Sequence, residues 1–259
     1  MIILFKAILR KLLLSTTIRN FFVFLRAFYF CKIKKQIKNF DKISNDTWKN
    51  TLDSNKRKII DININLPKHP DPHKLFDIGT KLATESYKYL FEVIKEKYTK
   101  SEYKNLKILT IGPRSEGEIY GIFASGFELS NITGIDLFSY SPYVKLGDMH
   151  NLDFQNEKFD IVFMGKVLAY SNNKKRAIEE AKKVLNKNGS LIIAHSLSKT
   201  LLSNEDVVKK RGYLIASPHN MLKTTEDLNN LVQSLGFKKF YLNILEQKNR
   251  KLVLYGASK

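Results

Sequence analysis

Short apolar runs alternate with segments of helical periodicity from residue 106 onward. Helical spacing of apolar residues is found over 118–125 and 174–185. The apolar runs have the length of strands and lie at 106–111, 132–137, 144–146, 159–164 and 190–194. Such alternation predicts an α/β domain, in which parallel strands form one sheet and helices cover both of its faces.

The end of the chain has a different pattern. A helical segment over 225–235 stops at Gly236, and two apolar runs follow at 240–245 and 251–255. The connector between these two runs is short and polar. Parallel strands need a crossover of a dozen or more residues, so this connector predicts an antiparallel hairpin. Together with the five earlier runs, the hairpin brings the predicted sheet to seven strands. A further helical segment at 76–99 precedes them.

The first 31 residues are strongly apolar but are interrupted by basic side chains. The longest stretch without a charge runs only over 12–18, whereas a membrane-spanning helix needs about 20 mostly apolar residues. A secretory signal needs an unbroken apolar core and a small-residue cleavage site, and neither is present. Ser15, Thr16 and Thr17 indicate a break between two helices. Lys6 and Arg10 share one helical face, and Arg19 and Arg26 share another.

The charge of this segment suggests where it lies. Nine basic residues and no acid precede Asp41, and the whole chain has a net charge of +19. This pattern favours helices in the interface of an anionic membrane, with lysine and arginine at the headgroups. Two other interpretations stay open: helices docked on the protein's own core or on a partner, and a targeting segment. The favoured interpretation predicts a cytoplasmic protein that is peripheral on the inner face of the membrane.

Composition excludes several classes of protein. The chain has 259 residues, 43% of them hydrophobic and 27% charged, which is typical of globular proteins. Its one cysteine, Cys31, cannot form an internal disulfide and is more often buried than lipidated in such a position. Neither the cysteine nor the 5 histidines have metal-site spacing, so no metal is expected. We divide the chain into a basic apolar segment (1–40), a linker (41–75) and a domain (76–259), and leave the oligomeric state open.

Four segments are predicted to meet at the carboxyl ends of the strands, where open α/β sheets bind their ligands. Gly112 and Gly117 border the turn after the first run. Asp136 ends the second run, 24 residues after Gly112, at a place and spacing suited to a ribose diol. Asp148 follows the third run, and Gly165 follows the fourth. The order and spacing of these residues indicate a nucleoside-containing cofactor.

Residues 106–196 resemble class I S-adenosylmethionine-dependent methyltransferases of the type 11 group. The resemblance is strongest over GDMHNLDFQNEKFDIVFMGKVLAYSNNKKRAIEEAKKVLNKNGSLIIA and does not include residues 1–75. It implies a Rossmann-like seven-stranded sheet, S-adenosyl-L-methionine as cofactor, Asp136 at the ribose and Asp148 at the adenine amino group. The cofactor-binding residues that it implies are Gly112, Pro113, Arg114, Gly117, Asp136, Leu137, Asp148, Met149 and Gly165.

The first motif of that family is altered in this chain. The usual pattern is Asp/Glu-x-Gly-x-Gly-x-Gly, but Thr110 stands at the acid, Arg114 at the second glycine and Glu116 at the third. Arg114 could pair with the cofactor carboxylate, and Glu116 or Glu118 could bind its ammonium group. The alternative is a non-catalytic, membrane-tethered relative with a degenerate cofactor site.

The residues that would act on the methyl acceptor are less clearly marked. Methyl transfer needs a general base only if the acceptor must lose a proton, and His195, Tyr170 and His150 lie near strand ends, with His195 best placed. Lys166 is predicted to face the cofactor or an acidic substrate, and 197–223 to form a lid over the acceptor. The apolar N-terminal segment suggests a lipid-linked or other hydrophobic small-molecule acceptor. Nucleic acid is the weaker choice, because no RNA-binding module is visible.

Overall fold

The computed structural model describes residues 2–36, 38–39, 81–113, 115–155, 157–171, 173–198, 222–247 and 250–259. The linker predicted at 41–75 and most of the predicted lid, 199–221, lie outside these residues. So do Arg114 and residues 76–80 of the helix predicted at 76–99.

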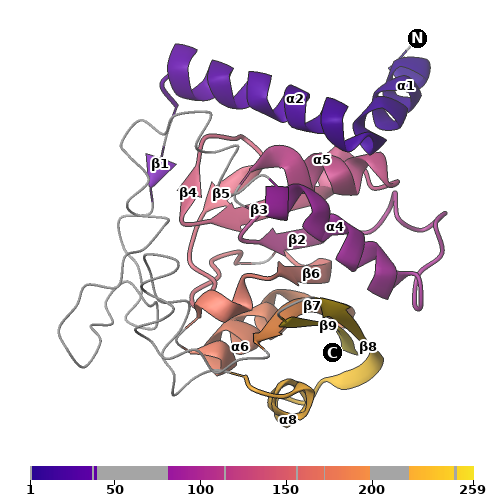
Figure 1. Ribbon diagram of the computed structural model, residues 1–259, viewed down its shortest axis with the longest axis vertical. Coiled ribbons are helices and arrows are strands. Elements are labelled where there is room, and N and C mark those ends of the chain that lie inside the picture. The colour runs from indigo at the N-terminus through magenta and orange to yellow at the C-terminus, as the bar shows by residue number, and fades with distance from the viewer. Residues whose placement is uncertain are drawn as a thin grey trace.

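The core of the molecule is one seven-stranded sheet, whose strands are labelled in Figure 1. Neighbouring strands follow the order β5 (Val144–Leu146), β3 (Ile132–Asp136), β2 (Ile108–Ile111), β6 (Phe159–Gly165), β7 (Leu185–Ser198), β9 (Arg250–Ser258) and β8 (Lys238–Gln247). The first five strands are parallel, and the β8–β9 hairpin adds antiparallel to β7 through β9. The predicted fold class, a Rossmann-like sheet closed by a C-terminal hairpin, is therefore confirmed.

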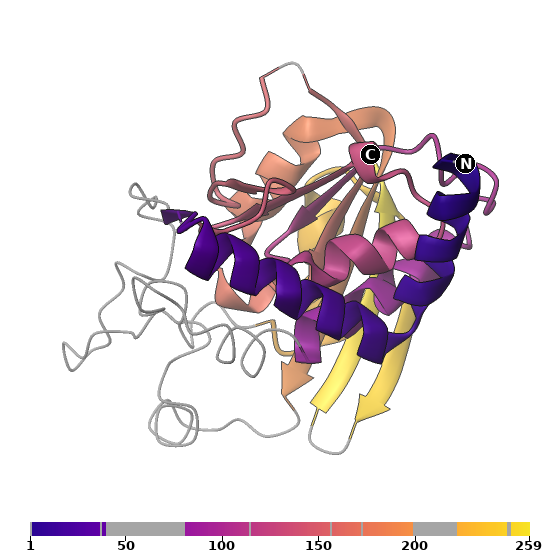
Figure 2. The same ribbon diagram turned by 90° about the horizontal axis from the view of Figure 1, so that it is seen from above.

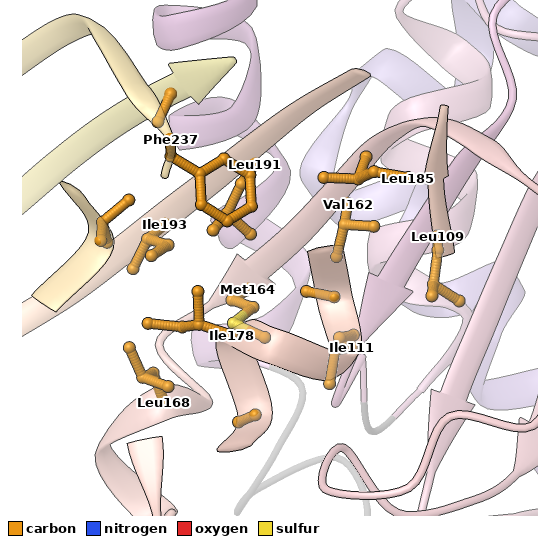
Figure 3. Packing of buried hydrophobic residues seen from close by; sticks show 14 of the residues in the cluster. Leu109, Ile111, Val162, Met164, Leu168, Ile178, Leu185, Leu191, Ile193 and Phe237 are labelled. Atoms are coloured by element: carbon orange, nitrogen blue, oxygen red, sulfur yellow. The ribbon is translucent and has the colours of Figure 1, made fainter. Parts of the chain in front are cut away.

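Each parallel strand sends alternate side chains to opposite faces of the sheet. On β2, Ile108 packs with α4 (Lys81–Ile94) and α5 (Glu116–Ala124), whereas Leu109 packs with α6 (Lys174–Val184) and α8 (Thr225–Ser234). Figure 3 shows this second cluster, where Ile178 of α6 meets strand residues such as Met164 and Ile193. The central strands are apolar on both faces because helices cover both faces.

Two short features were not visible in the sequence pattern. The fifth parallel strand was predicted from residue 190 but starts at Leu185, directly after α6, because Leu185 already pairs with Phe159 before the register shifts. The two-residue strands β1 (Lys38–Asn39) and β4 (Phe138–Ser139) form a small antiparallel pair. The other predicted strands and helices are confirmed to within a few residues.

The N-terminal segment forms two helices that lie against the domain. α1 (Ile2–Leu14) and α2 (Thr16–Phe28) meet at Ser15, as predicted, and a π-helical turn (Tyr29–Ile33) extends α2. Both helices contact α5, and Figures 1 and 2 show them as an outer layer beside it. Within the described residues, no helix has the length and apolar content needed to cross a bilayer.

The basic residues of these helices do not point where the sequence suggested. Lys6 and Arg10 both pair with Glu128, whereas Arg19 and Arg26 pair with acids of α4 and α5. Arg19 is fully buried. The expectation that these four cations meet lipid headgroups is therefore wrong. The domain carries acids beneath the helices, and an arginine taken from water is stable only with such partners.

The connection from β3 to β5 is unusually short. It runs over residues 137–143, all of them described, and contains only β4, although parallel neighbours usually need a helical crossover of a dozen or more residues. α2 covers this connection instead. Ala27 and Cys31 pack on Tyr140, and the Arg26 guanidinium lies 5.6 Å from the Tyr143 ring centre. Burial raises the pKa of the Cys31 thiol to about 11, so Cys31 is an inert core residue.

Candidate functional site

The sheet register brings the four predicted segments to one edge. Ile111 of β2 lies beside Ile135 of β3 and Met164 of β6, so Gly112, Asp136 and Gly165 follow at the same level. Asp136 in turn lies beside Leu146, two residues before Asp148. Residues that are up to 53 positions apart in the chain thus line the carboxyl edge of four adjacent strands.

Gly112 allows the main chain to turn sharply at this edge. Its φ is +73°, a conformation that side chains with a Cβ rarely adopt, and a Cβ there would lie 2.5 Å from Cγ2 of Val167. Its amide donates a hydrogen bond to the Ile135 carbonyl at 2.8 Å. Pro113 is buried beside it. Gly117 has a different role, since it lies in the first turn of α5, where its amide bonds to the capping Ser115 hydroxyl.

The altered first motif contains two buried carboxylates with different surroundings. Glu116 is already engaged, since its oxygens accept hydrogen bonds from Arg26 and Ser141. Glu118 instead accepts hydrogen bonds from the hydroxyls of Thr110 and Ser86. A carboxylate therefore lies against Thr110, the position where the family has its acid, but it comes from α5. Both Glu116 and Glu118 were predicted as candidates for the ammonium group of the cofactor. The contacts favour Glu118, because Glu116 is already paired with Arg26.

The surroundings of Glu118 disfavour its ionised form. Burial is the main cause that raises its pKa to about 7, and the nearby Asp136 carboxylate adds to the effect, while the two hydroxyl hydrogen bonds lower it. Asp136 is itself buried at the end of β3, and its carbonyl accepts the amide of Gly147 at 3.0 Å. Leu137, half-buried, follows it. Two carboxyls so close together make this edge suitable for a ligand that carries positive charge.

Asp148 is held by a chain of buried hydrogen bonds. Its Oδ1 lies 2.9 Å from the amide nitrogen of His150 and 2.7 Å from Nδ1 of the same residue. The other ring nitrogen, Nε2, lies 2.7 Å from the Ser171 hydroxyl. Both ring nitrogens of His150 are thus engaged, by Asp148 and Ser171, and its role as a base stays a prediction. Met149, between the two, is partly buried against the core.

His195 lies deeper than the sequence suggested. It is 3% exposed on β7, and its Nδ1 has no hydrogen-bond partner among the residues that the structure describes. Burial, with a smaller contribution from the Lys174 charge, lowers the pKa of His195 to about 4, so the ring is neutral at pH 7. Lys174 is also buried, which lowers the pKa of its amine to about 8. Lys174 was not predicted as a site residue, because nothing in the sequence distinguishes it from the neighbouring Lys175.

Two other nominated residues lie around the same edge. Tyr170 is half-buried at the end of a short 3-10 turn, Leu168–Tyr170. Lys166 has a φ of +65°, and its amine lies 4.8 Å from the ring centre of Tyr89 on α4. Among the residues that the structure describes, no three histidine, cysteine or acidic side chains are grouped as metal ligands would be.

Comparison with known proteins agrees with this geometry. Residues 115–193 match the family model of a methyltransferase domain of type 11. A protein of Methanocaldococcus jannaschii, MJ1123, is 33% identical over 88 residues, which are 34% of this chain and 42% of that one. The match thus spans less than half the length of this curated relative.

Solved structures agree in fold. A phosphoethanolamine N-methyltransferase 2 of Haemonchus contortus, in complex with phosphomonomethylethanolamine and S-adenosylhomocysteine, superposes with a TM-score of 0.51. The identity is 13%, and the superposition covers 72% of this chain and 57% of that one. The MccD protein gives a TM-score of 0.50 at 16% identity, over 66% of this chain and 96% of that one.

Proposed function

We propose that this chain, which carries a methyltransferase domain of type 11 in residues 115–193, transfers the methyl group of S-adenosylmethionine to a hydrophobic or lipid-linked acceptor. The observation that carries the proposal is the alignment of Gly112, Asp136 and Asp148 along one sheet edge. Asp136 would accept the ribose hydroxyls, Asp148 the adenine amino group, and Glu118 the ammonium group. When bound, the cofactor supplies both the methyl electrophile and its leaving group.

The chain itself would contribute alignment and, where needed, a base. Holding two reactants in line can supply about 7–11 kcal/mol of a barrier in well-oriented systems. His195 is our first candidate for the base, because its Nδ1 has no hydrogen-bond partner among the described residues. Burial lowers its pKa to about 4, so the neutral ring is a weak base at pH 7. Tyr170 is the second candidate for this role.

Cofactor binding tests the proposal directly. At 100 times its dissociation constant, S-adenosylmethionine should stabilise the protein by about 2.7 kcal/mol, which is roughly 5–10 °C in Tm for a chain of this length. Asp136→Ala is expected to abolish this rise, because it removes the ribose acceptor. Asp153→Ala, at an exposed position, is the matched control and should keep it. No rise at millimolar cofactor in the unaltered protein would contradict the proposal, and binding without turnover would favour the non-catalytic alternative.

We further propose that the outer face of α1 and α2 lies on an anionic membrane. Among the described residues, the exposed large hydrophobic side chains other than Leu242 and Ile244 all belong to this segment. The outer face consists of Leu4, Phe5, Ile8, Leu12, Leu14, Ile18, Phe21, Leu25, Phe28, Tyr29 and Ile33. Exposed large apolar side chains gathered on one segment are typical of an interaction site.

The charges around the outer face favour lipid as its occupant. Lys11, Lys32, Lys34 and Lys35 are exposed beside it, and no acid precedes Asp41. With Lys6 and the arginines paired to acids of the domain, these are the cations of the segment, among the side chains that the structure describes, left to meet headgroups. A membrane position would bring the site close to hydrophobic acceptors, which is why we favour an acceptor of that class.

Vesicle flotation checks the membrane proposal. The protein should float with vesicles of phosphatidylglycerol and phosphatidylcholine, less so as salt increases, and poorly with phosphatidylcholine alone. Phe5→Glu combined with Phe21→Glu should weaken binding more than tenfold, since burying one Phe contributes about 1.5–3 kcal/mol. Leu242→Glu, an exposed apolar position on β8, should bind normally. A concentration-dependent dimer that the double variant abolishes would instead assign the face to a second copy.

A further inference from the structure

We propose that Arg26 of α2 is a positioning residue for the cofactor-binding turn, which makes the N-terminal helix pair part of the methyltransferase site. The inference rests on the proposed function. The turn between β2 and α5 is where the family motif is altered, and Glu116 stands at its last glycine position. Arg26 lies outside the matched region, residues 115–193, and reaches this turn from a distant part of the chain.

The contact between the two residues is a two-point ion pair. Nε and Nη2 of Arg26 donate to the two carboxylate oxygens of Glu116 at 2.5 and 2.9 Å. Ser141, in the connection from β3 to β5, donates a third hydrogen bond at 2.6 Å. Such paired geometry fixes the orientation of both groups, which a single contact does not. The first residue of α5 is thereby tied to α2 and to the connection after β3.

The surroundings of Arg26 hold it in place. Its guanidinium lies between 5.0 and 6.0 Å from the ring centres of four aromatic residues: Phe22, Phe30, Tyr120 and Tyr143. Phe22 and Tyr120 also pack edge to face, 5.1 Å apart, across the boundary between α2 and α5. The arginine is therefore part of a packed interface and is not a surface cation that happens to reach an acid.

This arrangement explains why the altered motif can exist. Glu116 is 0% exposed, and a buried carboxylate without a partner would be strongly destabilising. A glycine at this position would need no such partner. A glutamate at this position therefore requires a cationic partner, and Arg26 of α2 provides it. The shape of the turn consequently depends on residues that precede the domain.

The two helices offer a matched control for this role. Arg10 of α1 makes a comparable pair with Glu128, with one contact at 3.0 Å to the carboxylate and one at 2.7 Å to the Phe127 carbonyl. Glu128 follows the other end of α5, away from the cofactor turn. Loss of either pair weakens the same helix docking, but only the Arg26 pair reaches the turn.

The test measures the Kd of S-adenosylmethionine by calorimetry on the full chain, together with Tm in the absence of cofactor. Arg26→Gln and Glu116→Gln should each raise Kd by about tenfold or more, because the turn loses its orientation. Arg26→Lys keeps the charge but not the two-point contact, so its Kd should be intermediate. Arg10→Gln should lower Tm by less, because Glu128 keeps Lys6 and is partly exposed, and should leave Kd within about twofold.

The outcomes separate the two proposals. If Arg26→Gln binds cofactor as tightly as the unaltered protein, or if Arg10→Gln weakens binding to the same degree, the positioning role is wrong and the pair only docks the helices. If Arg26→Gln does not fold, the comparison of Arg26→Lys and Glu116→Gln with Arg10→Gln decides. If the unaltered protein itself does not bind cofactor, the proposed function fails and this inference fails with it.

Discussion

A chain that begins at residue 41 is expected to lose its cooperative thermal transition. Leu13 and Val23 are buried in the same cluster as the side chains of α4 and α5, so removing the helices uncovers part of the core. The same deletion removes the cations that pair with Glu116 and Glu128, whereas Glu85 keeps Lys88. An uncompensated buried charge alone costs about 3–5 kcal/mol, against a typical total stability of about 5–15 kcal/mol.

Circular dichroism melting of the shortened and full-length chains would measure this effect. A synthetic peptide of residues 1–36, added to the shortened chain, should restore a transition, because the interface is specific and largely buried. The Asp153→Ala variant of the full chain controls for changes at an exposed site. A shortened chain that melts cooperatively within a few degrees of the full-length protein would mean that the helices are a detachable appendage.

The second large effect is expected from Glu118 as a function of pH. Its pKa is raised from 4.5 to about 7, so the folded protein holds this proton more tightly than the unfolded chain does. Stability contributed by the protonated group is fully present below pH 4.5 and is lost as the pH rises to about 7. The size of the shift corresponds to about 3 kcal/mol. In the cofactor-free protein, Glu118→Gln should therefore increase the free energy of unfolding relative to the unaltered protein. This increase should be larger at pH 8 than at pH 5.

Cofactor binding should reverse the preference of this carboxyl. An ammonium group beside Glu118 favours the ionised form, so binding at pH 6 should release a proton and affinity should increase up to about pH 7. Calorimetry in buffers of different ionisation enthalpy measures the released proton. Glu118→Gln should lose both the release and the pH dependence, whereas Glu157→Gln, at a half-buried carboxylate paired with Lys145, should keep them. An unchanged pH profile in Glu118→Gln would remove Glu118 from the site.

Sequence pattern located the strands and the edge where the site lies, because both are local properties. A run such as 159–164 is apolar since helices cover both faces of the sheet, and a residue that ends a strand must lie at the sheet edge. Gly112, Asp136 and Asp148 could therefore be placed together without a structure. The roles of these residues toward the cofactor stay predictions.

The pairings between distant segments could not be predicted in this way. Helical spacing shows that Arg19 and Arg26 share a face, but it does not show that the face meets α4 and α5. Glu116 and Arg26 are 90 positions apart, and neither has a local signature that indicates the other. The early start of β7 was missed for a related reason. Residues 186–189 have the composition of a turn, and they lie in the register shift between the Leu185 and Ser190 pairings of β7.

The separation of Arg26 from Glu116 also has a consequence for biosynthesis. The two helices are made first, but their partner α5 follows only about 90 residues later, which at about 5–20 residues per second is a delay of roughly 5–18 seconds. During that time the inner faces of α1 and α2, with Leu13 and Val23, have no partner to cover them. The nascent chain is therefore expected to expose apolar side chains on both faces of the helix pair until α5 has emerged.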